Sequence, residues 1–197
     1  TVQGGSREYV SRVEARLRAL GAEIRTGAPV AGVRRHAGGA DVRAHGADWE
    51  PFDEVIFATH SDDSLAMLSD ATAVERAALS AVKYQPNEVV LHADSAMMPR
   101  RRAAWASWVY TEARGQQKDR IDLTYWMNSL QPIPEDDPLF VTLNSTRNIR
   151  EELIHDVATF RHPVYTLAAL EAQETIRAIN GDRGTWFCGR SEERRVG

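Results

Sequence analysis

The apolar residues near the start of the chain follow a helical period. Within residues 6–20 they recur at spacings of three, four and three, at Val10, Val13, Leu17 and Leu20. Such spacing places them on one face of an α-helix. Ser6 can cap the first turn through its side-chain oxygen, and Gly21 suits the left-handed residue that often ends a helix. We therefore predict a helix between these two residues.

The pattern then changes to short strands. "AEIRTG", "APVAGVRRH" and "ADVRAHG" are β-like, and Gly38-Gly39 suits a hairpin turn between the last two. The run "FDEVIFAT" follows, with four consecutive apolar residues typical of a central parallel strand covered on both faces. It stops in Ala58-Thr59-His60-Ser61, and such small and polar residues leave room for a ligand to approach the backbone.

Further helices and a β-rich region complete the pattern. Ser61 is the expected cap of one helix, and Thr72 with Glu75 forms a capping box for the next. Residues 84–165 combine aromatic strands with Pro, Asp and Gly loops, which favours an antiparallel sheet in a second domain. A helix capped by Thr166 and a strand "RGTWFCG" follow. The order of elements indicates an α/β nucleotide-binding architecture combined with an α+β part.

Composition narrows the function. Of the 197 residues, 43% are hydrophobic and 26% charged, and the net charge of −4 argues against nucleic-acid binding. Arg100-Arg101-Arg102 could meet an anionic substrate or a membrane surface, although a solvated loop is the better explanation for only three charges. A single cysteine excludes an internal disulfide framework, and no apolar run reaches the roughly 20 residues that span a bilayer. We predict a cytoplasmic protein.

Familiar catalytic motifs are absent. There is no G-x-S-x-G elbow, and we expect Cys188 to be an inert thiol in a buried strand. The six histidines show no metal-ligand spacing, so no metal is predicted. His60 follows the presumed central strand, where open sheets place ligands, but a structural histidine is as good an explanation.

The aromatic residues of the second domain have two interpretations, core packing of a sheet or the walls of an apolar substrate tunnel: Trp105, Trp108, Tyr125 and Trp126. Tyr125 and Trp126 are neighbours on one presumed strand and should face opposite sides, so at most one of them can line a given pocket.

Two long segments carry a resemblance. "QGGSREYVSRVEARLRALGAEIRTGAPVAGVRR" and "FDEVIFATHSDDSLAML" resemble the flavin-containing amine oxidase superfamily, which includes phytoene desaturase-like and protoporphyrinogen oxidase-like enzymes. Shorter segments are similar to a bacterial branch of predicted NAD/FAD-binding proteins with an amine oxidase domain: "YQPNEVVLHAD", "MPRRRAAWASW", "TYWMNSLQ", "PLFVTLN", "HPVY" and "TWFCG". The resemblance runs from Val2 to Gly189.

The resemblance implies FAD as the cofactor. It places Pro29-Val30 beside the adenine and lets the small residues after the central strand approach the cofactor closely. The positions that it assigns to cofactor binding are Pro29, Val30, Ala58, Thr59, His60, Cys188 and Gly189. It assigns no catalytic residue.

The resemblance also implies a division into domains. Residues 1–61 would belong to a dinucleotide-binding, Rossmann-like FAD/NAD(P) domain, residues 62–165 to an inserted antiparallel-sheet substrate domain, and residues 166–189 to the first domain again. The tail "RSEERRVG", residues 190–197, matches a translated sequencing adapter and is interpreted as an artefact, the alternative being a genuine disordered tail. The family's G-x-G-x-x-G fingerprint is absent, so we expect an internal fragment that binds FAD weakly by itself.

The function implied is that of an FAD-dependent oxidoreductase, amine oxidase-like or desaturase-like, which transfers hydride from a substrate to flavin. The aromatic second domain favours a hydrophobic small-molecule substrate, for example an acyl or isoprenoid chain. The alternative is a non-enzymatic lipid- or protein-binding module with a vestigial flavin fold. A third interpretation is an inactive fragment.

Overall fold

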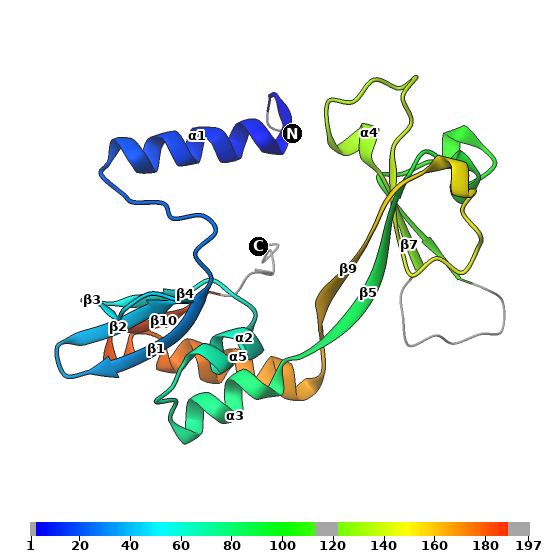
Figure 1. Cartoon of the computed structure of the whole chain (residues 1–197). Coiled ribbons are helices and arrows are strands. Elements are labelled where there is room, and N and C mark those ends of the chain that lie inside the picture. Colours follow the sequence, from blue (N-terminus) through cyan, green and yellow to red (C-terminus); the bar gives the residue numbers. More distant parts are fainter. Residues whose placement is uncertain (1–2, 113–121, 189–197) are drawn as a thin grey trace. The chain divides into compact units, whose positions relative to one another are not determined.

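The chain forms two compact units. The computed structural model describes residues 3–112 and 122–188 (Figure 1). Residues 1–24 and 86–162 belong to one unit, here called the sheet unit, and residues 25–85 and 163–197 belong to the other, the mixed unit. Each unit combines helices with strands, so the mixed α/β class predicted from the sequence is confirmed. No helix within the described ranges is long and apolar enough to cross a membrane.

The mixed unit contains two small sheets. An antiparallel meander comprises β1 (Val30–His36), β2 (Gly39–Ala44) and β3 (Glu50–Phe52), and a parallel pair comprises β4 (Val55–Phe57) and β10 (Thr185–Phe187). Its helices are α2 (Ser61–Met67), α3 (Ala73–Ala81) and α5 (Leu167–Ile179), with a 3-10 turn η4 (Asp182–Gly184) before β10.

The core of the mixed unit is formed by strands of both sheets and by the segment that contains helices α2 and α3. The rings of Phe57 and Phe187 stack with centroids 5.4 Å apart. Around them are buried Val33, Ala40, Leu68, Ala71 and Leu79. β4 and β10 lie far apart in sequence, so this stacked pair packs the last strand of the unit against a strand from its N-terminal part.

A buried arginine adds a polar centre to this core. The side chain of Arg35 is fully buried and is paired with Glu75, which is itself 6% exposed. Arg35 Nε also donates to Asp70 at 3.1 Å, and Asp70 accepts a second ion pair from Arg183 at 2.8 Å. Burial alone would raise the pKa of Glu75, but hydrogen bonds from Arg35 and Thr72 outweigh it and lower the pKa to about 2.

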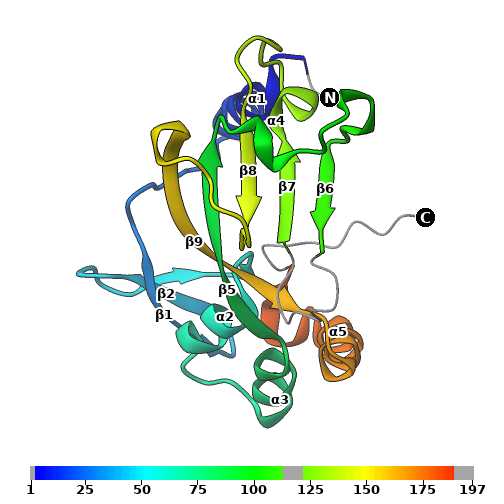
Figure 2. The ribbon, with the colours of Figure 1, turned by 90° about the vertical axis from the view of Figure 1, so that its right-hand side faces the viewer.

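The sheet unit is built on one five-stranded sheet with the order β6-β7-β8-β5-β9 (Figure 2). The strands are β5 (Lys83–His92), β6 (Trp108–Thr111), β7 (Asp122–Trp126), β8 (Phe140–Leu143) and β9 (Ile154–Val164). The pairs β6/β7, β7/β8 and β8/β5 are antiparallel, which confirms the predicted antiparallel sheet. Its helices and 3-10 turns are α1 (Gly5–Ala19), α4 (Met127–Leu130), η1 (Ser95–Met97), η2 (Arg102–Ala104) and η3 (Glu151–Leu153).

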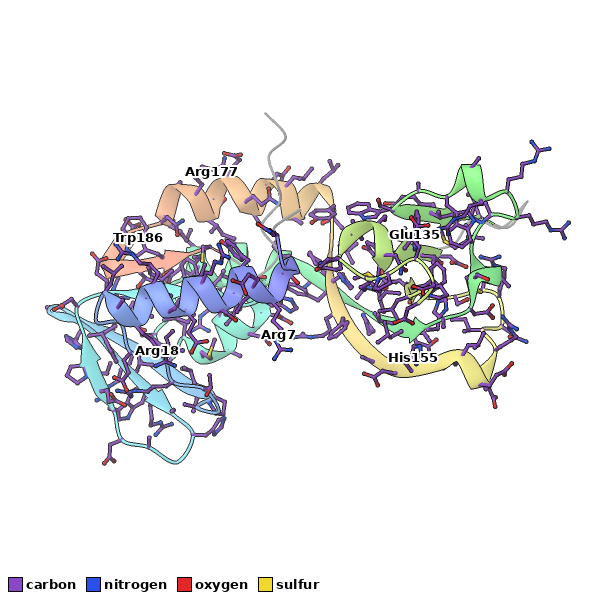
Figure 3. All side chains as sticks on the ribbon, turned by 90° about the horizontal axis from the view of Figure 1, so that it is seen from above. Arg7, Arg18, Glu135, His155, Arg177 and Trp186 are labelled. Atoms are coloured by element: carbon purple, nitrogen blue, oxygen red, sulfur yellow. The ribbon has the colours of Figure 1, made fainter. Side chains whose placement is uncertain are left out.

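Helix α1 touches the rest of its unit at its first residue. Gly5 is buried with a φ of 79°, and a Cβ there would lie 2.8 Å from Gln131 Oε1. That same oxygen accepts a hydrogen bond from Ser6 N at 3.2 Å. Only glycine combines this backbone angle with so close a neighbour. Figure 3 labels Arg7 and Arg18 along this helix.

Several local predictions are confirmed. The capping box of Thr72 and Glu75 is present, and Thr166 accepts a hydrogen bond from Ala169 N at the start of α5. Gly21, with a φ of 86°, follows α1 in the left-handed conformation. The turn between β1 and β2 joins His36 to Gly39, as the double glycine predicted.

Other local predictions were wrong. "AEIRTG" forms no strand, and Ser6 and Ser61 lie inside their helices, whose caps are Gly4 and His60. The strand "FDEVIFAT" is not covered on both faces, because Ile56 is 66% exposed while its neighbour Phe57 is 4% exposed. The run of apolar residues correctly indicated a parallel strand but overstated its burial.

Candidate functional site

The parallel pair brings two predicted cofactor segments to one edge. In a parallel pair the carboxyl ends of both strands lie at the same edge, and Phe57 is paired with Phe187. The residues that follow, Ala58 and Cys188, are both exposed. Cys188 N donates to the carbonyl oxygen of Phe57 at 3.0 Å, which holds the two strand ends together. Figure 3 labels Trp186, the residue of β10 that precedes this edge by two positions.

The exposure of Cys188 corrects one prediction. The sequence suggested an inert thiol in a buried strand, but β10 ends at Phe187 and the thiol lies one residue beyond it. Its Sγ is 3.5 Å from the carbonyl oxygen of Phe57. Gly189, the other predicted cofactor residue of this segment, lies outside the described residues.

Thr59 and His60 are held in place by helix α2. Ser64 Oγ donates to the carbonyl oxygen of His60 at 3.0 Å, so the Thr59 hydroxyl must donate to Ser64 Oγ at 2.8 Å. The imidazole of His60 is buried and stacks on Tyr84 with ring centroids 4.2 Å apart. Tyr84 Oη in turn accepts a hydrogen bond from Ser61 N at 2.8 Å. His60 is thus packed inward, and Ala58 presents the open backbone at this edge.

No pattern in the sequence pointed to Tyr84, because Tyr84 follows helices α2 and α3 and is 24 positions from His60. A group of possible metal ligands was also not predicted from the sequence. His60, Asp62 and Asp63 have ligand atoms within 4.8 Å of one another. We assign no metal to this group. Two acidic residues in the first turn of a helix are explained by the helix dipole.

Pro29 and Val30 lie elsewhere in the mixed unit. The carbonyl oxygen of Pro29 accepts a hydrogen bond from His45 N at 2.9 Å, and Val30 opens β1 opposite Ala44. No hydrogen bond or ring contact within the described ranges joins them to the edge at Ala58. The structure therefore brings Ala58, Thr59, His60 and Cys188 together. Pro29-Val30 lies apart from them, at the start of β1 in the β1-β2-β3 sheet.

The edge fits a cofactor that needs close backbone approach. A planar or dinucleotide group packs tightly against a strand end only where the side chains are small, and Ala58 and Cys188 meet that condition. The donor of the Thr59 hydroxyl is already used by Ser64, so Thr59 could offer a ligand only an acceptor.

The sheet unit carries a second open surface, here called the apolar face. Two rows of paired side chains cross strands β6, β7, β8 and β5: Trp108, Tyr125, Val141 and Leu91 in one, and Tyr110, Leu123, Leu143 and Val89 in the other. Side chains paired across antiparallel strands share one side of the sheet. All eight are apolar or aromatic. Leu123 and Val89 are buried, whereas Trp108 at the edge of the sheet is 54% exposed and Tyr110 is 62% exposed.

Tyr125 on the apolar face is neutral at neutral pH. Burial, and then the proximity of Tyr110, raises the pKa of Tyr125, so its phenol stays protonated. The ring of Tyr125 meets that of Trp108 edge to face, with centroids 5.5 Å apart. An exposed surface of this composition is typical of a binding site for an apolar partner.

The opposite face of the same sheet is covered. Trp105 packs edge-on against Trp126 and Phe140 with centroids 5.4 and 5.6 Å apart, and Arg102 lies over the rings of both tryptophans while it pairs with Glu135. Tyr125 and Trp126 therefore face opposite sides, as the alternation of a strand predicted. Core packing is confirmed for Trp105 and Trp126, and the substrate-tunnel interpretation stays a prediction for Trp108 and Tyr125.

These features define a mixed α/β protein with an open, small-residue edge on a parallel strand pair and an exposed apolar face on an antiparallel sheet. Residues 1–114 match the family model described as flavin containing amine oxidoreductase. The chain belongs to this family. The family is a flavin-containing one, so the flavin cofactor and the oxidoreductase class predicted from the resemblance are supported at that level.

A solved structure shares the fold. The crystal structure of a CLA-producing fatty acid isomerase from P. acnes is similar to 82% of this chain, with a TM-score of 0.54 and 13% sequence identity. The chain spans 42% of the length of that protein. No curated protein matches the sequence significantly.

Proposed function

We propose that this chain is part of an FAD-dependent oxidoreductase that takes a hydride from an apolar, chain-like substrate. Membership of a flavin-containing family supports the cofactor class. The observation that carries the substrate class is the apolar face, on which Trp108 and Tyr110 are more than half exposed. A fatty acid is also the substrate class named for the similar solved structure.

The roles of the residues follow from their positions. Ala58 and Cys188 would leave room for the flavin nucleotide, with Thr59 as an acceptor beside it. A bound flavin would accept a hydride from a C–H bond of the substrate. The apolar face would bind the substrate chain and exclude water. This role needs no acid or base among the eight side chains of the face.

We further propose the arrangement that the resemblance implied. Residues 1–61 and 166–189 would form part of a Rossmann-like FAD domain, and residues 62–165 would form the inserted substrate domain. The isolated chain would then bind FAD weakly. Purification of the 197-residue chain with stoichiometric flavin would contradict that last expectation.

The test of the substrate class compares two exposed tyrosines. Tyr110 on the apolar face is 62% exposed, and Tyr9 on α1 is 57% exposed. We expect Tyr110→Ala to weaken binding of a fluorescent long-chain fatty acid about tenfold, because roughly 1.5 kcal/mol of aromatic burial is lost, and Tyr9→Ala to leave it unchanged. Equal effects of the two substitutions would exclude the face as the binding site.

Turnover separates an enzyme from a binding module. In the native gene product, anaerobic addition of acyl or isoprenoid compounds should bleach the oxidised flavin absorbance, whereas small polar amines should not. Fatty-acid binding without any flavin reduction would favour the non-enzymatic lipid-binding alternative. Reduction by amines alone would refute the apolar substrate.

A further inference from the structure

The covered face of the five-stranded sheet carries a row of buried polar side chains. His92 on β5, Thr142 on β8 and Thr124 on β7 are each fully buried, and Asp122 at the start of β7 is 4% exposed. The row is connected at one end, because His92 Nε2 lies 2.7 Å from Thr142 Oγ1, which lies 2.9 Å from Thr124 Oγ1. Buried polar groups of this kind are normally all hydrogen-bonded.

The protonation of His92 fixes the hydrogens of this row. His92 Nδ1 accepts a hydrogen bond from Asp94 N at 3.1 Å, so it carries no proton. The proton of the neutral ring is therefore on Nε2 and is donated to Thr142. Burial lowers the pKa of His92 to about 4, which keeps the ring neutral.

One hydroxyl hydrogen in the row is left over. Three hydrogens, on His92 Nε2 and on the two threonine hydroxyls, are available for two hydrogen bonds. Whichever way the threonine pair is oriented, one hydroxyl hydrogen has no acceptor among the described residues. When Thr142 donates to Thr124, the hydrogen left over is that of Thr124.

Asp122 lacks a hydrogen-bond donor, whereas the threonine row has one hydroxyl hydrogen too many. Its Oδ2 accepts two hydrogen bonds from Thr146, from the backbone nitrogen at 2.9 Å and from the hydroxyl at 2.7 Å. Its Oδ1 is buried and has no hydrogen-bond partner in the part of the chain that the structure describes. A buried carboxylate oxygen without a donor is costly, so a donor is expected there.

We propose that a single buried water molecule binds between Thr124 and Asp122, accepting the hydroxyl hydrogen of Thr124 and donating to Asp122 Oδ1. The two residues are two positions apart on one strand, so their Cβ atoms lie on the same face about 6.8 Å apart. No hydrogen bond joins the two side chains among the described residues, and a water molecule about 2.8 Å from each oxygen would link them. Thr111 stands opposite Asp122 in the register and offers a third partner.

The water would complete one continuous hydrogen-bond row across the sheet. It would run from Asp94 N through His92, Thr142, Thr124 and the water to Asp122, and end at Thr146. A fully satisfied polar row holds the register of neighbouring strands, whereas a partly satisfied one would weaken the core. The proposal does not depend on the flavin or on the apolar face.

A crystal structure of the chain at high resolution tests the proposal directly. We expect an electron-density peak within about 3.2 Å of both Asp122 Oδ1 and Thr124 Oγ1. The peak should persist in Thr124→Ser, which keeps the hydroxyl, and disappear in Thr124→Val, which keeps only the shape. A protein donor bonded directly to Asp122 Oδ1, or an empty site there, would overturn the proposal.

Unfolding in urea gives a second test in solution. Thr124→Val removes a partner of the water, and we expect it to lower the equilibrium constant of folding roughly tenfold. Thr175→Val on α5 makes the same chemical change at a half-buried helical position, where the hydroxyl bonds to the carbonyl oxygen of Glu171, and we expect a change of less than about twofold. Equal effects of the two substitutions would contradict the proposed water.

Discussion

Replacing Glu75 by Gln removes one charge from the buried centre of the mixed unit and leaves its shape. Gln at this position can still accept the hydrogen bond from Thr72 N that completes the capping box. Arg35 then faces a neutral amide instead of a carboxylate. The substitution therefore isolates the contribution of the charge.

The expected loss follows from the pKa of Glu75. Net stabilisation by Arg35 and Thr72, against the opposing effect of burial, lowers this pKa from 4.5 to about 2. Each pKa unit corresponds to about 1.4 kcal/mol, so the folded state gains about 3 kcal/mol at neutral pH. Loss of one partner from a buried ion pair independently suggests roughly 3–5 kcal/mol.

The dependence on pH has a definite sign. A carboxyl with a lowered folded pKa stabilises the fold above its unfolded pKa, and the contribution is lost as the pH falls from about 4.5 to about 2. We expect the difference in the free energy of unfolding between wild type and Glu75→Gln to be about 3 kcal/mol at pH 7 and about 1 kcal/mol at pH 3. Urea unfolding followed by circular dichroism measures both values.

Glu174 provides the matched control. It pairs with Arg177 on α5, but its side chain is 72% exposed. Glu174→Gln should cost less than about 0.5 kcal/mol at either pH. The reasoning is refuted if the two substitutions cost the same at pH 7, or if the cost of Glu75→Gln does not fall with pH.

Three further predictions follow from single residues. Burial lowers the pKa of His92 from 6.5 to about 4, so the fold loses stability as the pH falls through that range. In urea unfolding, His92→Gln should therefore flatten this part of the plot of stability against pH. An unchanged slope would contradict the prediction. Thr166→Ala removes the cap of α5 and should lower the free energy of unfolding by about 1 kcal/mol, a value that thermal unfolding can check. Cys188 should react with a thiol reagent such as dithionitrobenzoate in the folded chain, and a reaction that requires denaturant would show that the thiol is buried.

Elements with local causes could be predicted from the sequence. The capping box at Thr72, the cap at Thr166 and the hairpin at Gly39 each depend on residues a few positions apart. The alternation of Tyr125 and Trp126 depends only on the geometry of a strand. By contrast, Ser6 and Ser61 show that a residue suited to cap a helix need not be its cap, because a residue one or two positions earlier can take that place.

Features that depend on distant residues could not be predicted. Nothing near Arg35 in sequence indicates that Glu75 and Arg183 surround the same site. The stacking of His60 on Tyr84 also depends on how two helices return the chain to β4. The exposed state of Ile56 and Cys188 was missed for the same reason, because burial depends on which other segments cover a strand.

The mixed unit is discontinuous in sequence, and this has a consequence for its synthesis. The contact between Cys188 and Phe57 joins residues 131 positions apart, and β10 supplies the partner strand of β4. A ribosome that has made β4 must therefore complete the whole sheet unit before that strand can pair. Such long-range closure slows folding, and β4 stays without its partner strand until the chain has been made as far as β10.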